Sequence, residues 1–304
     1  LFYAKILLFG EYGIIKDSKG LAIPFNSYKG ALKSAQNLSG EAIKSNINLH
    51  KFYQYLLNLN TDLVIFNLNE LKKDINSGMY FDSSIPQGYG VGSSGALVAS
   101  IYDRYANNKI TVLENLTRDK LLQLKTVFSL MESFFHGKSS GLDPLNSYLS
   151  LPILINSKEN IEAAGIPSQK EGKGAVFLLD SEQTGATEPM VNIFMNKMKN
   201  EGFRRMISEE FSAHTDACID DFLKGNVKSL FSNVKSLSKV VFTNFKPMIP
   251  KAFHQIWEKG LQTNSYYLKL CGSGGGGYIL GFTEDYSKAQ EILKDYKLEL
   301  VYRF

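Results

Sequence analysis

The sequence predicts an α+β protein built from two domains. Its 304 residues suffice for one large or two medium domains with a substantial hydrophobic core. Residues 2–9 and 297–302 are rich in strand-forming side chains, whereas residues 188–260 are dominated by helical spacing of apolar side chains. From this change in the pattern of apolar residues we expect two domains, over residues 1–180 and 181–304.

Composition narrows the class of protein. Hydrophobic residues make up 44% of the chain and charged residues 21%, which is typical of a soluble globular protein. We expect no membrane partner, because no apolar run approaches the ~18 residues of a membrane span. Two cysteines, Cys218 and Cys271, form neither a disulfide framework nor a CxxC metal pair, which favours a cytoplasmic location. The net charge of +4 is mild and the lysines are dispersed, so we expect no nucleic-acid partner.

Residues 2–9 alternate in a β-rich pattern and predict the first strand. Lys5 interrupts its apolar run, and a single lysine in a strand most often faces solvent. The other elements expected in the first domain follow from strand propensity, helical spacing and turn residues. They are short strands over 12–33 with turns at 16–20 and 24–27, a helix over 49–59, and strands over 63–68, 78–85, 151–156 and 175–180.

A glycine-rich turn joins the strand over 78–85 to a helix expected over 93–106. It reads PQGYGVGSSGAL from Pro86 to Leu97. Glycines permit positive φ and close approach of a ligand, and the start of the helix directs unpaired N–H groups at the turn. The combination is typical of an anion site, and a polyphosphate is the best candidate ligand. It differs from the common P-loop because no lysine follows the glycines, and alone it could be only a tight turn.

Two acidic residues stand near the end of the next expected helix. Apolar residues at helical spacing predict this helix over 119–135. Glu132 lies in its last turns, where apolar neighbours and the helix dipole both disfavour a carboxylate. Asp143 follows in an expected loop, where Asp before Pro is most often a turn or cap pair.

The second domain is expected to be helical first and β-rich later. We predict helices over 188–224, 226–241, 249–260 and 286–293, and strands over 265–270, 278–282 and 297–302. Between two of these strands lies CGSGGGG (271–277). Consecutive glycines cost stability, so a ligand approaching the backbone is the better account. His214 and Cys218 are four residues apart on a helix, and we interpret them as core or surface residues, not metal ligands.

The order of these features resembles the GHMP kinase superfamily and, within it, the mevalonate kinases most closely. The family's first motif, a lysine-bearing strand ending in Gly-Glu-His, is matched by AKILLFGEYGI (4–14). Its phosphate loop is matched by PQGYGVGSSGAL (86–97), and its third motif by KLCGSGGGG (269–277). The segment H-G-(N/T/K)-P-S-G-(I/V)-D is matched by HGKSSGLDP (136–144), and the loop entering the second domain by SEQTGATEPMV (181–191).

This resemblance implies a fold and a set of roles. The first domain would resemble domain 2 of ribosomal protein S5 and the second would be ferredoxin-like, with the active site in the cleft between them. ATP and Mg²⁺ would be the cofactors. Asp143 would accept the proton of the attacking hydroxyl and Lys5 would pair with it, while Ser94 (or Ser93) and Glu132 would hold Mg²⁺. The expected nucleotide contacts are Gly88, Gly90, Gly92, Ser93, Ser94, Gly95, Gly274 and Gly275, and the expected acceptor contacts are Glu11, Tyr12 and Ser140.

The resemblance also implies a reaction. It is the ATP-dependent phosphorylation of a small-molecule alcohol, with mevalonate giving 5-phosphomevalonate for isoprenoid biosynthesis. Two departures flank the expected acceptor site, because Tyr12 stands where the family has His and Ser139 where it has Pro. A kinase for galactose, another sugar or another small alcohol is therefore an alternative.

Two further alternatives are less favoured. A diphosphomevalonate decarboxylase fits less well, because Gly10-Glu11 and the acidic pair follow the kinase pattern. A non-catalytic, ligand-binding relative would be expected to lack at least one of Lys5, Ser94, Glu132 and Asp143, and all four are present. A homodimer is left open.

Overall fold

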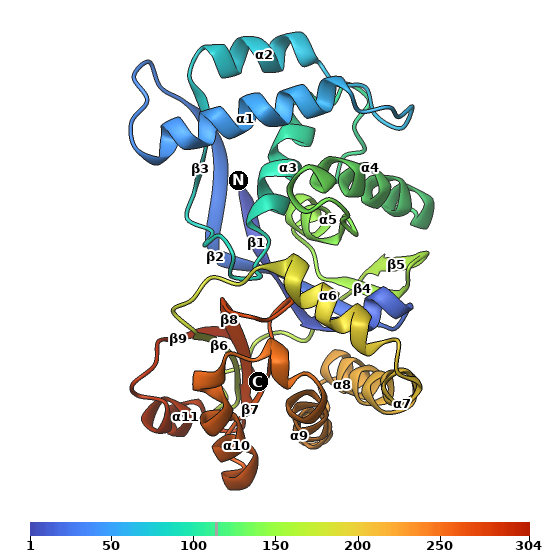
Figure 1. Cartoon of the computed structure of the whole chain (residues 1–304), viewed down its shortest axis with the longest axis vertical. Helices are drawn as coiled ribbons and strands as arrows, with labels where there is room; N and C mark the ends of the chain where they lie inside the picture. Colours follow the sequence, from blue (N-terminus) through green and yellow to red (C-terminus); the bar gives the residue numbers. More distant parts are fainter. Residues whose placement is uncertain (113–114) are drawn as a thin grey trace.

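The computed structural model describes residues 1–112 and 115–304. Figure 1 shows two sheets, each with its own helices, stacked along the long axis of the molecule. Both sheets are antiparallel. In the part of the chain that the structure describes, no helix is long and apolar enough to cross a membrane.

The first sheet is organised around one long strand. Its strands are β1 (Phe2–Phe9), β2 (Gly20–Ser34), β3 (Met79–Ser83), β4 (Ile153–Ser157) and β5 (Asn160–Ala163). The 15-residue β2 pairs with β4 near its start, with β1 along its middle and with β3 at its end. Such length gives the sheet the order β1-β2-β4-β5, with β3 beside β2.

Several expectations for the first half are wrong. The short strands expected over 12–33 are a 3₁₀ turn at Gly13–Lys16 and the single strand β2. The turn expected at 24–27 lies inside β2, where the pairing with β1 jumps from Phe25 to Lys29 and leaves the residues between as an irregularity. The strand expected at 63–68 is reduced to an isolated bridge from Phe66 to Ala106. A helix begins at Leu68 instead. The Asn67 side chain caps this helix by accepting a hydrogen bond from the Glu70 N–H in its first turn.

Five helices accompany the first sheet: α1 (Glu41–Leu57), α2 (Leu68–Asn76), α3 (Ser93–Tyr105), α4 (Arg118–His136) and α5 (Leu142–Leu149). The helices expected over 93–106 and 119–135 are confirmed as α3 and α4. Helix α3 packs against both α5 and β1. This packing places the start of α3, the start of α5 and the middle of β1 next to one another.

The second sheet has the order β7-β8-β6-β9. Its strands are β6 (Ala175–Asp180), β7 (Tyr267–Leu270), β8 (Tyr278–Thr283) and β9 (Leu298–Arg303), with α11 (Tyr286–Ile292) between the last two. Helices separate β6 from β7 and β8 from β9, so the chain runs β-α-β-β-α-β, which is the ferredoxin-like arrangement expected. The domain boundary expected after residue 180 stays a prediction. The two sheets are divided before β6, one strand earlier in the chain, because β6 pairs with β8 and β9 of the second sheet.

The helices between β6 and β7 are α6 (Thr187–Lys197), α7 (Glu201–Met206), α8 (Ser212–Lys224), α9 (Val227–Asn244) and α10 (His254–Thr263). The single helix expected over 188–224 is broken, because Asn200 leaves the helix and its side chain caps α7 by accepting from the Phe203 N–H at 3.0 Å. Short 3₁₀ turns lie at Gly13–Lys16, Lys246–Met248 and Lys251–Phe253, and a π-helical turn at Ile207–Phe211 joins α7 to α8.

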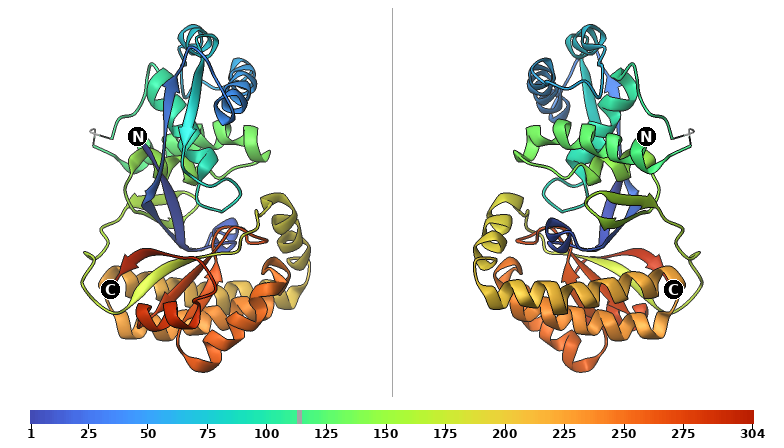
Figure 2. Two further views of the ribbon diagram at one scale, coloured as in Figure 1. Left: turned by 90° about the vertical axis from the view of Figure 1, so that its left-hand side faces the viewer. Right: turned by 90° about the vertical axis from the view of Figure 1, so that its right-hand side faces the viewer.

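A shared core joins the two halves. One cluster of buried apolar side chains runs from β1 and β2 into β6, β8 and the helices of the second half. Phe9 at the end of β1 stacks on Phe282 of β8, with ring centroids 5.4 Å apart. Side views in Figure 2 show the end of β1 descending onto the second sheet. The residues that follow β1 therefore lie against the second half.

Candidate active site

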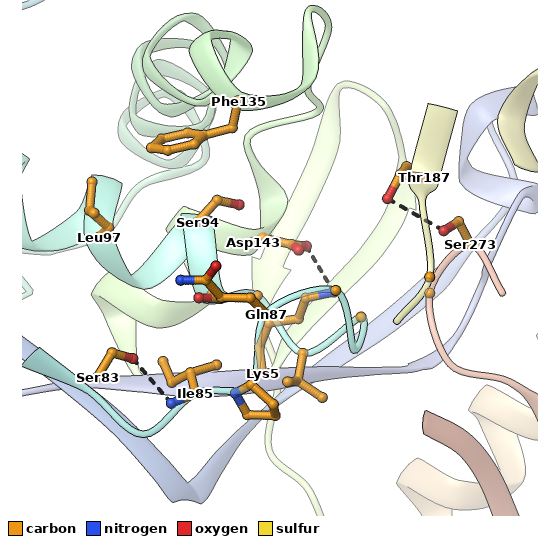
Figure 3. Close-up of a pocket in the computed structure, with 18 of the residues that line it drawn as sticks. Lys5, Ser83, Ile85, Gln87, Ser94, Leu97, Phe135, Asp143, Thr187 and Ser273 are labelled. Carbon is orange, nitrogen blue, oxygen red and sulfur yellow. Dashed lines mark hydrogen bonds and ion pairs between the residues drawn. The ribbon is translucent and has the colours of Figure 1, made fainter. Parts of the chain in front are cut away.

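A cavity of about 730 Å³ lies where loops from both halves meet. Its lining includes residues of β1, β3, the start of α1, the glycine-rich loop before α3, the start of α5, the start of α6 and the glycine-rich loop after β7. Figure 3 shows the pair Lys5 and Asp143 between two sides of the cavity. Ser83, the last residue of β3, lies on one side, and Thr187 and Ser273 lie on the other.

The loop before α3 has the backbone that its glycines predict. Gly88, Gly90 and Gly92 all have positive φ, and Gly92 is the residue from which α3 begins. A Cβ on Gly90 would stand 2.6 Å from the carbonyl oxygen of Cys271, so glycine is required for the two glycine-rich loops to touch. The Lys5 N–H donates to the Val91 carbonyl at 3.0 Å, which fixes the loop against β1.

The loop after β7 is also held by backbone contacts. The Gly277 N–H donates to the Gln183 carbonyl at 2.5 Å, and the Gly185 N–H donates to the Gly88 carbonyl at 2.8 Å. Three segments far apart in the chain thus form one connected rim of the cavity. Because these contacts use backbone atoms, the rim depends on glycine geometry more than on particular side chains.

Lys5 and Asp143 form the ion pair that the family resemblance implies, with Nζ 2.8 Å from Oδ1. Lys5 is only 5% exposed, so the solvent-facing interpretation of this lysine is wrong. Burial alone would lower the pKa of Lys5, but the neighbouring Asp143 carboxylate raises it above 10.5, and the side chain stays an ammonium.

Asp143 lies in a helix and not in the loop expected there. It stands in the first turn of α5, where the helix dipole favours a negative charge. Gly141 is the residue before this helix and has φ of 74°, and a Cβ there would stand 2.1 Å from the Lys125 carbonyl oxygen. Glycine therefore lets the chain turn tightly against α4 and direct Asp143 at Lys5.

Glu132 is a buried carboxylate held by two hydroxyl groups. It is 3% exposed, and its two oxygens accept hydrogen bonds from Ser94 Oγ, at 3.0 Å, and from Ser139 Oγ. Burial, followed by the negative charge of Asp143, raises the pKa of Glu132 to about 7. An opposite charge at this place would offset both causes.

The donors around Glu132 fit a magnesium ion. Mg²⁺ prefers oxygen ligands and is usually held by one or two carboxylates together with substrate phosphates. Glu132 offers a carboxylate in need of a counter-charge, and the Ser94 hydroxyl lies beside it at the edge of the cavity. The described residues contain no group of three or more His, Cys, Asp or Glu side chains able to hold a metal by themselves. A metal here would therefore complete its ligand set with oxygens of water or of a phosphate.

Two expected acceptor residues are engaged with the second half. Glu11 forms a buried ion pair with Lys269, 2.5 Å apart, and burial raises the pKa of Glu11 in spite of this partner. The Tyr12 hydroxyl donates to the Ser273 carbonyl at 2.6 Å, and its ring packs on Phe194 with centroids 4.7 Å apart. Both residues line the cavity, but their polar atoms already join the segment after β1 to the second half, Glu11 to Lys269 in β7 and Tyr12 to Ser273 in the loop after β7.

Three expected contact residues lie outside the described lining of the cavity. Ser140 is exposed, and its Oγ accepts from the Leu142 N–H at 3.4 Å at the start of α5. Gly95 is buried where α3 meets α5, and its Cβ would stand 2.7 Å from the Asp143 carbonyl carbon. Gly275 packs on Met190 and donates its N–H to a backbone carbonyl. Packing accounts for the two glycines and a local hydrogen bond holds Ser140, so ligand contact by these three residues stays a prediction.

Sequence reasoning missed the roles of Lys269, Ser139 and Thr187. Lys269 carried a signal, since it is a lysine in an apolar strand directly before the glycine run. In the sequence Ser139 is only a departure from the family motif near the expected acceptor site, whereas in the structure its hydroxyl donates a hydrogen bond to Glu132. Thr187 lies at the start of α6, and its Oγ1 is 3.4 Å from Ser273 Oγ.

Comparison with known proteins identifies the fold. No protein-family model matches the sequence, and no curated protein matches it. Among solved structures, the L. major mevalonate kinase with R-mevalonate aligns with a TM-score of 0.65 and 17% identity, covering 96% of this chain and 89% of that one. The Streptococcus pneumoniae phosphomevalonate kinase, in complex with phosphomevalonate and AMPPNP, aligns with a TM-score of 0.61 and 13% identity, covering 99% of this chain and 98% of that one. The Lactococcus lactis galactokinase with galactose aligns with a TM-score of 0.60 and 13% identity, covering 99% of this chain and 92% of that one. The chain therefore has the GHMP kinase fold over nearly its whole length.

Proposed function

We propose that this chain is an ATP- and Mg²⁺-dependent kinase that phosphorylates a hydroxyl group of a small molecule, with mevalonate as the first acceptor to test. The observation that carries the proposal is the Lys5–Asp143 ion pair inside the cavity, 2.8 Å between Nζ and Oδ1. The fold supports it, because the similar solved structures include three kinds of small-molecule kinase.

The residues suit phosphoryl transfer. The acceptor oxygen would attack the γ-phosphorus, its proton would pass to Asp143, and the bond from the γ-phosphorus to the ADP oxygen would break. The Asp143 carboxylate lies beside the Lys5 ammonium, and a carboxylate can accept the proton of a nucleophile that loses it late in a loose transition state. The Lys5 ammonium would stabilise negative charge on the transferred group.

The nucleotide phosphates would lie against the loop over 86–92 and the start of α3. Backbone N–H groups at a helix start bind anions, and the positive φ values of Gly88, Gly90 and Gly92 keep Cβ atoms out of the way. Ser94 and Glu132 would hold Mg²⁺, which would neutralise phosphate charge when bound. The loop over 272–276 would close the other side.

Mevalonate stands first among acceptors because the motif resemblance favours it, and its product would be 5-phosphomevalonate in isoprenoid biosynthesis. Galactose or another sugar is the alternative, since the fold similarity is nearly equal for galactokinase and the mevalonate kinase. The acceptor would bind near Thr187 and Ser273, which lie across Asp143 from Ser83 (Figure 3). Tyr12, whose hydroxyl donates to the Ser273 carbonyl, would lie beside it. The proposal includes a cytoplasmic location, which the free, buried thiols of Cys218 and Cys271 support.

The test is ADP release by the purified protein with ATP and Mg²⁺ and, one at a time, R-mevalonate, phosphomevalonate and galactose. Lys5→Met provides the matched negative control, because it removes the buried ammonium beside Asp143. We expect acceptor-dependent ADP release with mevalonate and its loss in the variant. ADP release with galactose and not with mevalonate would identify the sugar, in place of mevalonate, as the acceptor. Nucleotide binding without turnover on any alcohol in a wider panel would favour a non-catalytic relative and refute the proposal.

A further inference from the structure

The short loop between α4 and α5 contains a serine with an unusual set of contacts. Ser139 Oγ donates a hydrogen bond to Oε2 of Glu132. Ser139 Oγ also accepts a hydrogen bond from the Gly141 N–H at 3.1 Å, and the Ser139 carbonyl accepts one from Ser129 Oγ at 2.6 Å. A hydroxyl has one proton to donate, so accepting from Gly141 leaves that proton for Glu132.

Glu132 is consequently held at both of its oxygens by different parts of the chain. Ser94, at the start of α3, donates to Oε1 at 3.0 Å, and Ser139 donates to Oε2. One hydrogen bond would leave the carboxylate free to rotate about its last torsion, which is a broad and weakly restrained angle in glutamate. Two donors on opposite oxygens select one orientation. The orientation keeps Oε1 beside Ser94, which itself lines the cavity.

We infer that Ser139 is a positioning residue that orients the Glu132 carboxylate for a divalent cation bound with the nucleotide. The inference rests on the proposed function, because it assigns to Glu132 the metal named there. It explains a departure from the motif, since a proline at position 139 has no hydroxyl to donate. Groups that orient metal-binding carboxylates typically change metal affinity about 10- to 100-fold when they are removed.

A purely structural role for Ser139 predicts a different outcome. Its contacts with Ser129 and Gly141 also shape the loop, so a loss of stability alone would not distinguish the two roles. Metal affinity does distinguish them, because it depends on the orientation of Glu132 and not on how firmly the loop is closed. Ser139→Thr keeps the oxygen and tests for rescue.

The experiment measures Mn²⁺ binding by electron paramagnetic resonance to the full chain saturated with a non-hydrolysable ATP analogue, without acceptor. The variants are Ser139→Ala and Ser139→Thr, with Ser133→Ala as the matched control. Ser133 is the residue after Glu132, and its Oγ donates to the Ser129 carbonyl at 2.7 Å within α4. Circular dichroism and urea denaturation confirm that each variant is folded under the assay conditions.

We expect Ser139→Ala to weaken Mn²⁺ binding about 10-fold, Ser139→Thr to restore it to within about 3-fold, and Ser133→Ala to leave it unchanged. Equal Mn²⁺ affinity in wild type and a folded Ser139→Ala overturns the inference and leaves the kinase proposal standing. Failure of the wild-type protein to bind Mn²⁺ with the nucleotide overturns both. The two failures are therefore distinguishable in one titration.

Discussion

Replacing Glu132 by glutamine should stabilise the metal-free protein at pH 8 while removing its response to Mg²⁺. Glu132 is 3% exposed and accepts hydrogen bonds from Ser94 and Ser139. Glutamine has nearly the same shape, and its amide can accept from one hydroxyl and donate to the oxygen of the other. The substitution therefore removes a buried charge with little change in packing.

The magnitude follows from the pKa of this group. Burial and then the charge of Asp143 raise the pKa of Glu132 from its ordinary 4.5 to about 7. The folded state binds the proton more tightly than the unfolded state, so the free energy of unfolding falls as the pH rises from 4.5 to 7. One pKa unit is worth about 1.36 kcal/mol, so above pH 7 the ionised carboxylate costs the folded protein about 3 kcal/mol. Below about pH 4.5 the group is protonated in both states and the cost disappears.

Urea denaturation in EDTA at pH 8 and pH 5 measures this cost. We expect Glu132→Gln to raise the free energy of unfolding by about 3 kcal/mol at pH 8 and by less than about 1 kcal/mol at pH 5. Glu258→Gln, which changes an exposed carboxylate on α10, is the control and should stay within about 0.5 kcal/mol at both pH values. Added Mg²⁺ with an ATP analogue should stabilise the wild type and not Glu132→Gln. A variant less stable than wild type at pH 8 without metal would refute the reasoning.

Three further predictions, which use four substitutions, test the site. Asp143→Asn should lower turnover about 10²- to 10⁴-fold while calorimetry shows nucleotide affinity intact, and wild-type turnover would exclude Asp143 as the base. Lys269→Met should lower the free energy of unfolding by about 3–5 kcal/mol in urea, because Glu11 loses its buried partner. Adding Glu11→Gln should restore most of that loss, and no recovery would contradict the pairing. Tyr12→Phe removes the 2.6 Å bond to the Ser273 carbonyl and should cost about 1 kcal/mol, and an unchanged melting temperature would show that this bond contributes nothing.

Elements with strong local signals could be predicted from the sequence. The strand over 2–9, the helix after the glycine-rich turn and the apolar helix that carries Glu132 all match β1, α3 and α4. In each case the periodicity of apolar side chains and the glycines at the boundary act within a few residues. The turn expected at 24–27 failed for the opposite reason, because pairing with β1 on both sides overrides the local turn preference.

The sequence by itself determined which chemical groups are available and in what order. A lysine in the first strand, a glycine-serine turn, two carboxylates and a second glycine run are local features, and their order pointed to the fold that the comparisons identify. The sequence did not determine the roles that depend on contacts between distant residues. From the residues alone Lys5 is most often a surface lysine, whereas the structure buries it beside Asp143. The role of Ser140 as an acceptor contact stays a prediction.

Only the tertiary structure decided which of these groups meet and what burial does to them. Glu11 and Lys269 are 258 residues apart and form a buried ion pair, because the end of β1 descends onto the second sheet. Packing of α3 against α5 brings Asp143 to Lys5, and the fold of the α4–α5 loop brings Ser139 to Glu132. The physical reason is that charge pairing and desolvation depend on distance and burial in three dimensions, which residue spacing along the chain does not encode.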